Sequence, residues 1–236
     1  MNRSLTEWLA AYHEDRTACM EAVFQQENRY ELCLELFTAL FDELKERYQK
    51  LGISEQIYRD TRSDLEIWRG NCRRMYGVDG LANYRWLQNH LDLKLFRLGR
   101  LQFEPVVNEG RIALNVHIPQ GEPLVYEACR ESYRQAYAFY HGMTDRFVCH
   151  SWLLSPVLQE LLPESSNIVR FQKDFEITHY DPNDRQCEER VFGEISDDYG
   201  SYPQKTSLQR AVREKLLRGE PIGAAQGEFR YRMESN

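Results

Sequence analysis

The sequence predicts a helical N-terminal domain, residues 1–92, followed by a domain of mixed helices and strands, residues 93–236. The first observation is the spacing of apolar residues, which is helical before this boundary and alternates with polar residues from Leu95 onward. The second is a strand–helix–strand pattern between Arg111 and Trp152, typical of a crossover between two parallel strands. The predicted fold class is therefore α+β or α/β: an N-terminal helical domain and then a mixed β-sheet flanked by helices.

Residues 4–50 are expected to be helical, because apolar side chains recur every three or four residues and no proline interrupts them. Ser4 can cap the first helix with its hydroxyl. We interpret this region as a pair of helices that bury aromatic side chains. Gly52 breaks the pattern, and Ser54 can cap a further helix over residues 57–68.

An acidic pair lies on this further helix. Asp60 and Asp64 are four residues apart and therefore share one helix face. Paired carboxylates can perform acid–base chemistry, but three arginines lie close by in the sequence: Arg59, Arg62 and Arg69. We therefore interpret the pair as part of a solvated or salt-bridged face.

A β-hairpin is predicted where the spacing changes. Apolar residues alternate with Gln102 and Glu104, and turn-forming residues at 108–110 lead into a strand over residues 111–118. Antiparallel pairing in this hairpin brings Gln102 and Glu104 close to Asn115 and His117.

The strand at 111–118 begins the crossover. A helix is predicted over residues 125–140, and a second, buried strand follows over residues 146–154. In open sheets of this kind, ligands bind beyond the carboxyl ends of the parallel strands. His117 falls near one such end and His150 near the other, and this is the best functional clue in the sequence.

The rest of the chain predicts shorter elements. A short helix is expected after Ser155 as its cap, followed by strand-like sequence over residues 167–180 with a possible hairpin partner at 190–193. A helix over residues 206–217 and a last short strand around Phe229 complete the pattern.

Composition excludes several classes of protein. No apolar run approaches the roughly 20 residues that a membrane helix needs, and the N-terminus lacks the apolar core of a signal peptide, which predicts a cytoplasmic protein without membrane contact. The 6 cysteines contain no Cys-x-x-Cys pair, so reduced thiols are expected. A net charge of −7 disfavours nucleic acid as a partner. The oligomeric state is left open.

Three blocks of sequence carry a resemblance to a known family. They are residues 52–68 with 83–87 and 95–104; His117-Ile-Pro-Gln-Gly-Glu-Pro-Leu124 with Phe147-Val-Cys-His-Ser-Trp-Leu-Leu154; and residues 166–172 with 206–211. They resemble bacterial acyltransferase-domain proteins with a helical N-terminal domain and a GNAT-like C-terminal domain. The resemblance implies a sheet whose two central parallel strands splay apart to hold acyl-coenzyme A (acyl-CoA).

The same resemblance implies a function. It suggests an N-acyltransferase that acts on a small amine, with acetyl-CoA or another acyl-CoA as co-substrate. The loop over residues 118–124 stands where the family's glycine-rich phosphate loop is expected, so Ile118, Gln120 and Gly121 are the predicted cofactor-binding residues. This loop has one glycine, two prolines and the acidic Glu122, which would repel phosphate. The alternative is therefore a GNAT-like binding or interaction module without catalysis.

His117 and His150 are the predicted catalytic residues. Acyl transfer to an amine needs a base for the amine proton, and a histidine titrates in the right range. Each has a structural alternative: His117 as a histidine hydrogen-bonded between sheet and helix, His150 as a satisfied core histidine. Alternation turns His117 to the same face as Asn115.

Other reactive residues carry weaker predictions. Cys149 faces the opposite side of its strand from His150, so we expect a buried, inert thiol. Ser151 lacks a Gly-x-Ser-x-Gly setting, and no spacing supports a metal site. Three arginines of the last helix are expected on a solvated face: Arg210, Arg213 and Arg218.

Overall fold

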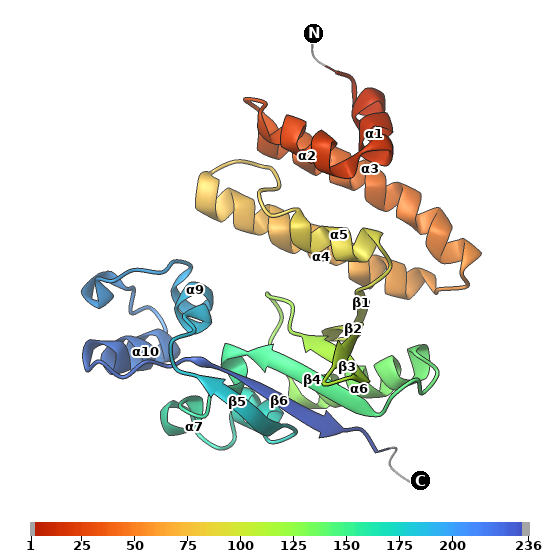
Figure 1. Ribbon diagram of the computed structural model, residues 1–236. Helices are drawn as coiled ribbons and strands as arrows, with labels where there is room; N and C mark the ends of the chain where they lie inside the picture. The colour runs from red at the N-terminus through yellow and green to blue at the C-terminus, as the bar shows by residue number, and fades with distance from the viewer. Residues whose placement is uncertain (1–2, 233–236) are drawn as a thin grey trace. The chain divides into compact units, whose positions relative to one another are not determined.

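The computed structural model describes residues 3–232, and the chain forms two compact units (Figure 1). The first consists of Met1–Leu98 with Pro119–Gly121, and the second of Gly99–Ile118 with Glu122–Asn236. The boundary at residues 92 and 93 stays a prediction. Among the described residues, no helix has both the length and the apolar character to cross a membrane.

The first unit is a bundle of helices. Its elements are α1 (Leu5–Glu14), α2 (Arg16–Phe24), α3 (Arg29–Lys50), α4 (Glu55–Tyr76), α5 (Arg85–Leu91) and the short strand β1 (Phe96–Leu98). Residues 4–50 therefore hold three helices rather than a pair. Ser4 caps α1 in a capping box with Glu7, and the Ser54 hydroxyl accepts from the Ile57 N–H at the start of α4. The long helices α3 and α4 lie side by side and bury aromatic residues such as Phe37, Phe41 and Tyr58.

The acidic pair on α4 does not form a solvated face. Asp64 is 2% exposed, and its Oδ2 accepts hydrogen bonds from Trp86 Nε1 at 2.8 Å and His90 Nε2 at 3.0 Å. The other ring nitrogen of His90 lies 2.8 Å from the Leu95 carbonyl oxygen. Asp60, one turn earlier, is partly exposed, and its carboxylate accepts a hydrogen bond from Gln56 Nε2 at 2.8 Å. The interpretation from sequence was therefore wrong for Asp64, because α5 supplies the donors that its burial requires.

The second unit is built on a mixed sheet. Its strands are β2 (Leu101–Asn108), β3 (Arg111–His117), β4 (Arg146–Ser151), β5 (Glu176–Asp181) and β6 (Ala224–Arg230), in the order β2-β3-β4-β6-β5. Its helices are α6 (Tyr126–Phe139), α7 (Leu158–Leu161), α8 (Asn167–Gln172), α9 (Gln186–Phe192) and α10 (Ser207–Leu217), with short 3₁₀ turns at Trp152–Leu154 and Tyr199–Ser201. β3 and β4 are parallel neighbours joined through α6, so the predicted crossover is confirmed.

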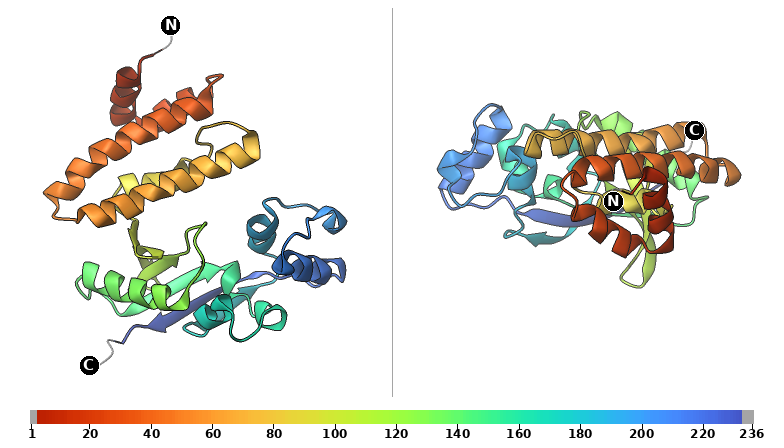
Figure 2. Two further views of the ribbon diagram at one scale, coloured as in Figure 1. Left: turned by 180° about the vertical axis from the view of Figure 1, so that it is seen from behind. Right: turned by 90° about the horizontal axis from the view of Figure 1, so that it is seen from above.

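One face of this sheet is apolar and packs against α6, which crosses it in the left view of Figure 2. The ring of Tyr133 on α6 lies 5.6 Å from that of Phe147 on β4 and 4.8 Å from that of Phe229 on β6, centroid to centroid. Phe103 on β2 completes this aromatic core at 6.3 Å. Buried rings at these separations stabilise the packing of α6 on the sheet.

Three predicted elements beyond β4 were wrong in type or position. Residues 167–172 form α8, capped by the Ser166 hydroxyl, and not a strand. Residues 190–193 lie at the end of α9, and the partner of β5 is β6. Ser155 is not a helix cap, because its hydroxyl donates to the Ile222 carbonyl oxygen at 2.5 Å. Short apolar runs fit a helix or a strand equally well, and distant partners decide between them.

We expect Asp64→Ala to lower the free energy of unfolding by about 3 kcal/mol, because Nε2 of the fully buried His90 would lose its acceptor. Asp60→Ala is the matched control on the same helix face, with an expected change within about 0.5 kcal/mol. Urea denaturation of both variants measures the difference. Equal losses would show that Asp64 has no special structural role.

Candidate active site

The carboxyl ends of β3 and β4 separate. Their parallel register joins Leu114 to Phe147 and Asn115 to Val148, and it ends there. β3 continues to His117 and β4 to Ser151, while β4 stays paired with β6 over its whole length. Peptide groups on the two facing edges can therefore meet a third group in the gap, and their N–H groups can donate to a carbonyl oxygen placed there.

A polar cluster lies at this point on the face of the sheet opposite α6. The β2–β3 register pairs Glu104 with Asn115 and Gln102 with His117, as the sequence predicts. Glu104 Oε1 lies 2.9 Å from His117 Nε2 and 3.1 Å from Asn115 Nδ2. The two nitrogens lie 3.1 Å apart because both approach the same oxygen. About a fifth of the His117 and Glu104 side chains is exposed (22% and 23%), so solvent or a ligand can reach them.

This geometry assigns the proton on His117. A carboxylate offers only acceptors, so the short contact with Glu104 requires the hydrogen on Nε2. Glu104 thus orients the His117 ring.

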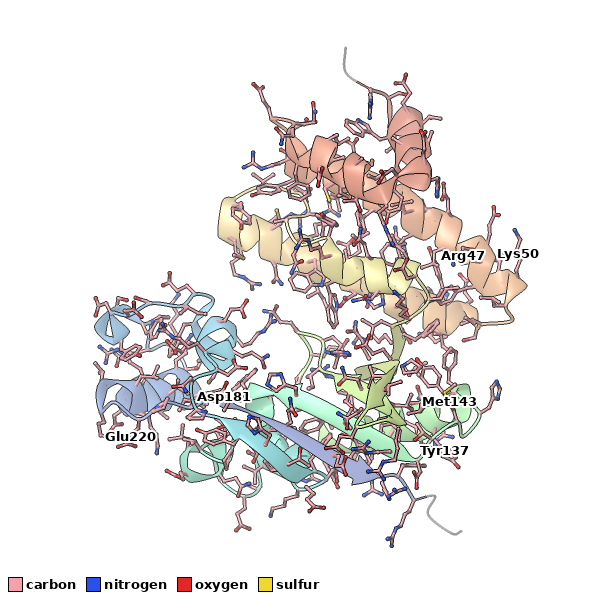
Figure 3. All side chains as sticks on the ribbon, in the orientation of Figure 1. Arg47, Lys50, Tyr137, Met143, Asp181 and Glu220 are labelled. Carbon is pink, nitrogen blue, oxygen red and sulfur yellow. The ribbon has the colours of Figure 1, made fainter. Side chains whose placement is uncertain are left out.

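His150 is not a core residue. Its side chain is 45% exposed, and Nε2 lies 3.4 Å from Asp184 Oδ2 in the turn after β5, which ends at Asp181 (Figure 3). Phe147 and Cys149 are apolar but lie on the opposite face of β4. Their nearness in sequence made residues 146–154 resemble a strand buried on both faces. Because Val148 pairs with Asn115, His150 shares the polar face with Asn115 and His117.

The two neighbouring nucleophiles have structural roles. Burial raises the pKa of the Cys149 thiol to about 12, so the thiol stays protonated and inert, as the alternation predicts. The Ser151 hydroxyl accepts from the Leu153 N–H at 3.1 Å and caps the turn after β4. Among the described residues, no group of three or more metal-ligating side chains is assembled.

The comparisons with known proteins fit this geometry. Residues 95–229 match a GNAT-like C-terminal domain, and residues 2–93 match an N-acyltransferase N-terminal domain. The chain belongs to this acyltransferase family. A comparison with curated proteins found no match.

Solved structures of acyltransferases share the fold. One, in complex with decanoyl-CoA and teicoplanin, is 28% identical with a TM-score of 0.79, over 86% of this chain and 67% of its own. Another, in complex with CoA and 10C-teicoplanin, is 27% identical with the same TM-score and the same coverage of both chains. A mutant in complex with octanoyl-CoA matches equally well at 27% identity. The family and the GNAT-like fold predicted from the sequence are both confirmed.

The loop in the position of the family's phosphate loop follows β3 directly. Gly121 has a φ of +112°, a backbone conformation that side chains other than glycine rarely adopt. Arg100 donates to the carbonyl oxygens of Glu122 at 2.6 Å and Pro123 at 3.0 Å, and so fixes the entry to α6. Within the described part of the chain, no N-cap side chain accepts from the first turn of α6, where the Glu127 carboxylate bonds to its own N–H.

Gln120 of this loop lies in the first unit. Its Oε1 accepts a hydrogen bond from Asn71 Nδ2 of α4 at 3.1 Å. Two arginines of α10 and the one at its C-cap do not form a free anion site. Arg210 and Arg213 donate to the Gln204 and Gly200 carbonyl oxygens, and Arg218 pairs with Glu214 and Glu220.

One carboxylate with a buried oxygen was not predicted from the sequence. Asp174, between α8 and β5, accepts from the Tyr126 hydroxyl at 2.9 Å through Oδ1. Its Oδ2 and the Tyr133 hydroxyl are buried without hydrogen-bond partners among the described residues. Burial raises the pKa of Asp174 above its ordinary value. No spacing signals this group, because α6 and α8 bring it together from distant parts of the chain.

We expect Asp174→Asn to stabilise the protein at pH 8 by roughly 1 kcal/mol, since it removes a poorly solvated charge but keeps the acceptor for Tyr126. The raised pKa means that the folded state holds its proton longer than the unfolded chain. The stability gained from this tighter proton binding is fully present below the pKa of the unfolded chain, near 4. It is lost as pH rises through the pKa of Asp174 in the folded state.

Denaturation curves at pH 4 and pH 8 test this sign. The wild type should lose stability relative to Asp174→Asn only at the higher pH. Asp145→Asn, which neutralises an exposed carboxylate paired with Arg230, is the control and should bring no gain. An Asp174→Asn variant that is less stable than the wild type at pH 8 would contradict the argument.

Proposed function

We propose that this protein is an acyl-CoA-dependent N-acyltransferase that acts on a small amine, with His117 as the catalytic base. The observation that carries the proposal is the hydrogen-bonded Glu104–Asn115–His117 cluster at the point where β3 and β4 separate. A base oriented by a carboxylate, beside strand edges that can receive a thioester, is what acyl transfer to an amine requires.

In the proposed reaction, the amine nitrogen attacks the thioester carbonyl carbon. A C–N bond forms while the C–S bond breaks. The proton of the amine passes to the imidazole of His117, and CoA leaves as the thiolate. Strand N–H groups stabilise the negative charge on the carbonyl oxygen, and Glu104 stabilises the protonated ring. His150, held near Asp184, takes the supporting role of positioning the amine.

The co-substrate in this proposal is acetyl-CoA or another acyl-CoA. Ile118, Gln120 and Gly121 are its proposed binding residues. The complexes of similar acyltransferases with decanoyl-CoA and octanoyl-CoA support a longer acyl chain as a further possibility to test. A cytoplasmic location is proposed as well, and the free, buried state of all 6 cysteines supports it.

A second function belongs to a different class. The acidic Glu122 and the two prolines of the loop favour a GNAT-like module that binds a partner without catalysis. This alternative predicts no productive use of acyl-CoA.

Titration calorimetry with acetyl-, octanoyl- and decanoyl-CoA separates the two functions. The acyltransferase is expected to bind at least one of them with a Kd well below about 1 mM, the range of ordinary enzyme–substrate affinities. Absence of binding for all three at millimolar ligand would favour the binding module.

Substitution of the two histidines tests their roles. His117→Ala should lower kcat about a hundredfold or more, because a positioned base is lost. His150→Ala should change the free energy of unfolding by no more than about 0.5 kcal/mol, because nearly half of this side chain is exposed. Thermal melting and activity at saturating substrates measure both effects. Full activity in a folded His117→Ala variant would show that His117 is structural.

A further inference from the structure

The polar face of the sheet contains a hollow of about 260 Å³ beside the Glu104–Asn115–His117 cluster. It is lined from β2, β3, β4, β5 and β6 by residues that include Asn115, Val148, His150, Thr178, Gln226 and Glu228. Asn115 and Val148 are the last pair before β3 and β4 separate, and Asn115 bonds to the carboxylate that orients His117. The hollow therefore adjoins the point at which the two strands separate.

The charges around the hollow favour a cation. Its lining holds two carboxylates, Glu109 and Glu228, and one guanidinium, Arg146, so two negative charges against one positive leave a net charge of −1 with histidine neutral. Arg146 is 5% exposed, and its guanidinium donates hydrogen bonds to protein oxygens. The acceptors are Glu228 Oε2 at 2.8 Å, the Asn108 carbonyl and side-chain oxygens at 2.8 Å each, and Glu109 Oε2 at 3.1 Å.

Glu228 keeps one oxygen for a ligand. The contacts of its carboxylate with Arg146 use Oε2, whereas Oε1 has no hydrogen-bond partner among residues 3–232. The side chain is 32% exposed, so the pairing with Arg146 holds it in place without sealing it off. A carboxylate oriented in this way can accept a charge-assisted hydrogen bond from an ammonium group.

The remaining lining groups are suited to hydroxyls. Thr178, Gln226, Asn115 and His150 present hydroxyl, amide and imidazole groups beside three valines, Val106, Val107 and Val148. An alkyl or aryl amine would cover these polar groups without offering them hydrogen-bond partners, whereas a hydroxylated amine would find several partners. The volume fits about nine water molecules at roughly 30 Å³ each, which corresponds to one small polar molecule or the amine-bearing end of a larger one.

We infer that this hollow is the acceptor site and that it selects a hydroxylated amine over an apolar amine, with Glu228 as the residue that first recognises the ammonium form. The ammonium group loses one proton to water before the neutral amine attacks the thioester and passes its second proton to His117. This inference rests on the proposed acyltransferase function. Glu228 determines specificity and is distinct from the base, which is His117.

A neighbouring hollow of about 280 Å³ beside α9 and α10 is less suited to this role. His150 does not line it, and its arginine, Arg185, is held by Glu188 at 2.6 Å and by Asp197 at 2.8 Å.

A pair of isosteric amines tests the selectivity. Serinol (2-amino-1,3-propanediol) and 3-aminopentane have the same number of heavy atoms and differ only in two hydroxyls exchanged for methyls. With octanoyl-CoA as donor, kcat/KM for serinol should exceed that for 3-aminopentane about tenfold or more, because a site built for hydroxyls rejects the analogue that lacks them. Equal values, or a preference for 3-aminopentane, would overturn the inference.

Glu228→Gln should lower kcat/KM for serinol about tenfold, mainly through KM, since one charge-assisted hydrogen bond is lost. Glu176→Gln is the matched control: Glu176 lies opposite Glu228 on β5 but does not line the hollow, and its variant should behave as wild type. Thr178→Val, a change of one exposed hydroxyl, provides a second variant if Glu228→Gln does not fold. Identical effects of Glu228→Gln and Glu176→Gln, or of Thr178→Val on both amines, would contradict the assignment.

Binding of serinol alone separates this inference from the proposed function. Two-dimensional NMR of the full chain should show serinol-dependent shifts of the Thr178, Gln226 and His150 amides, and these shifts should weaken in Glu228→Gln. Shifts without any acyl-CoA binding in calorimetry would refute the acyltransferase and keep the cation site. Acyl-CoA binding without shifts at these amides would keep the acyltransferase and refute the acceptor site.

Discussion

Each strand of the sheet sends alternate side chains to opposite faces, and this constraint organises the second unit. On one face, aromatic rings of β2, β4 and β6 pack under Tyr133 of α6. On the other, the same strands present carboxylates, amides and imidazoles. A shift of one residue in the β2–β3 register would move Glu104 under α6 and separate it from His117, so packing of the apolar face also fixes the geometry of the polar one.

The pairing of β3 with β4 ends early, and this leaves strand edges that can bind a ligand. Backbone groups within a complete ladder have no capacity for a ligand, whereas two parallel strands that separate after Asn115 and Val148 leave edges at one end. The polar cluster stands beside those edges because Asn115 belongs to both the last pair and the hydrogen-bond set of Glu104. Strand separation and base orientation are thus two consequences of one register.

Buried carboxylates in the two units illustrate how burial is balanced. Asp64 is surrounded by donors, and Trp86 and His90 share one of its oxygens. Asp174 has Tyr126 on one oxygen and no partner among the described residues on the other, and burial accordingly raises its pKa. On the polar face, Glu228 is intermediate, since Arg146 satisfies one oxygen and solvent reaches the side chain. The number of donors around each carboxylate therefore decides whether it stabilises the fold or remains available to a ligand.

The sequence by itself determined the local features of this protein. The alternation from Leu95, the hairpin, the crossover and the opposite facing of Cys149 and His150 all depend on neighbours a few residues apart, and the structure has them. The same holds for the capping residues Ser4 and Ser54. Tertiary structure decided the features that depend on distant partners. β6 pairs with β4 and β5 and supplies Glu228, although its sequence suggested only a short final strand. α5 buries Asp64, the turn after β5 brings Asp184 to His150, and the α8 residues form a helix instead of a strand. Periodicity records which face of an element is apolar, but the partner that covers this face, and the donor that meets a buried carboxylate, exist only once the chain has folded.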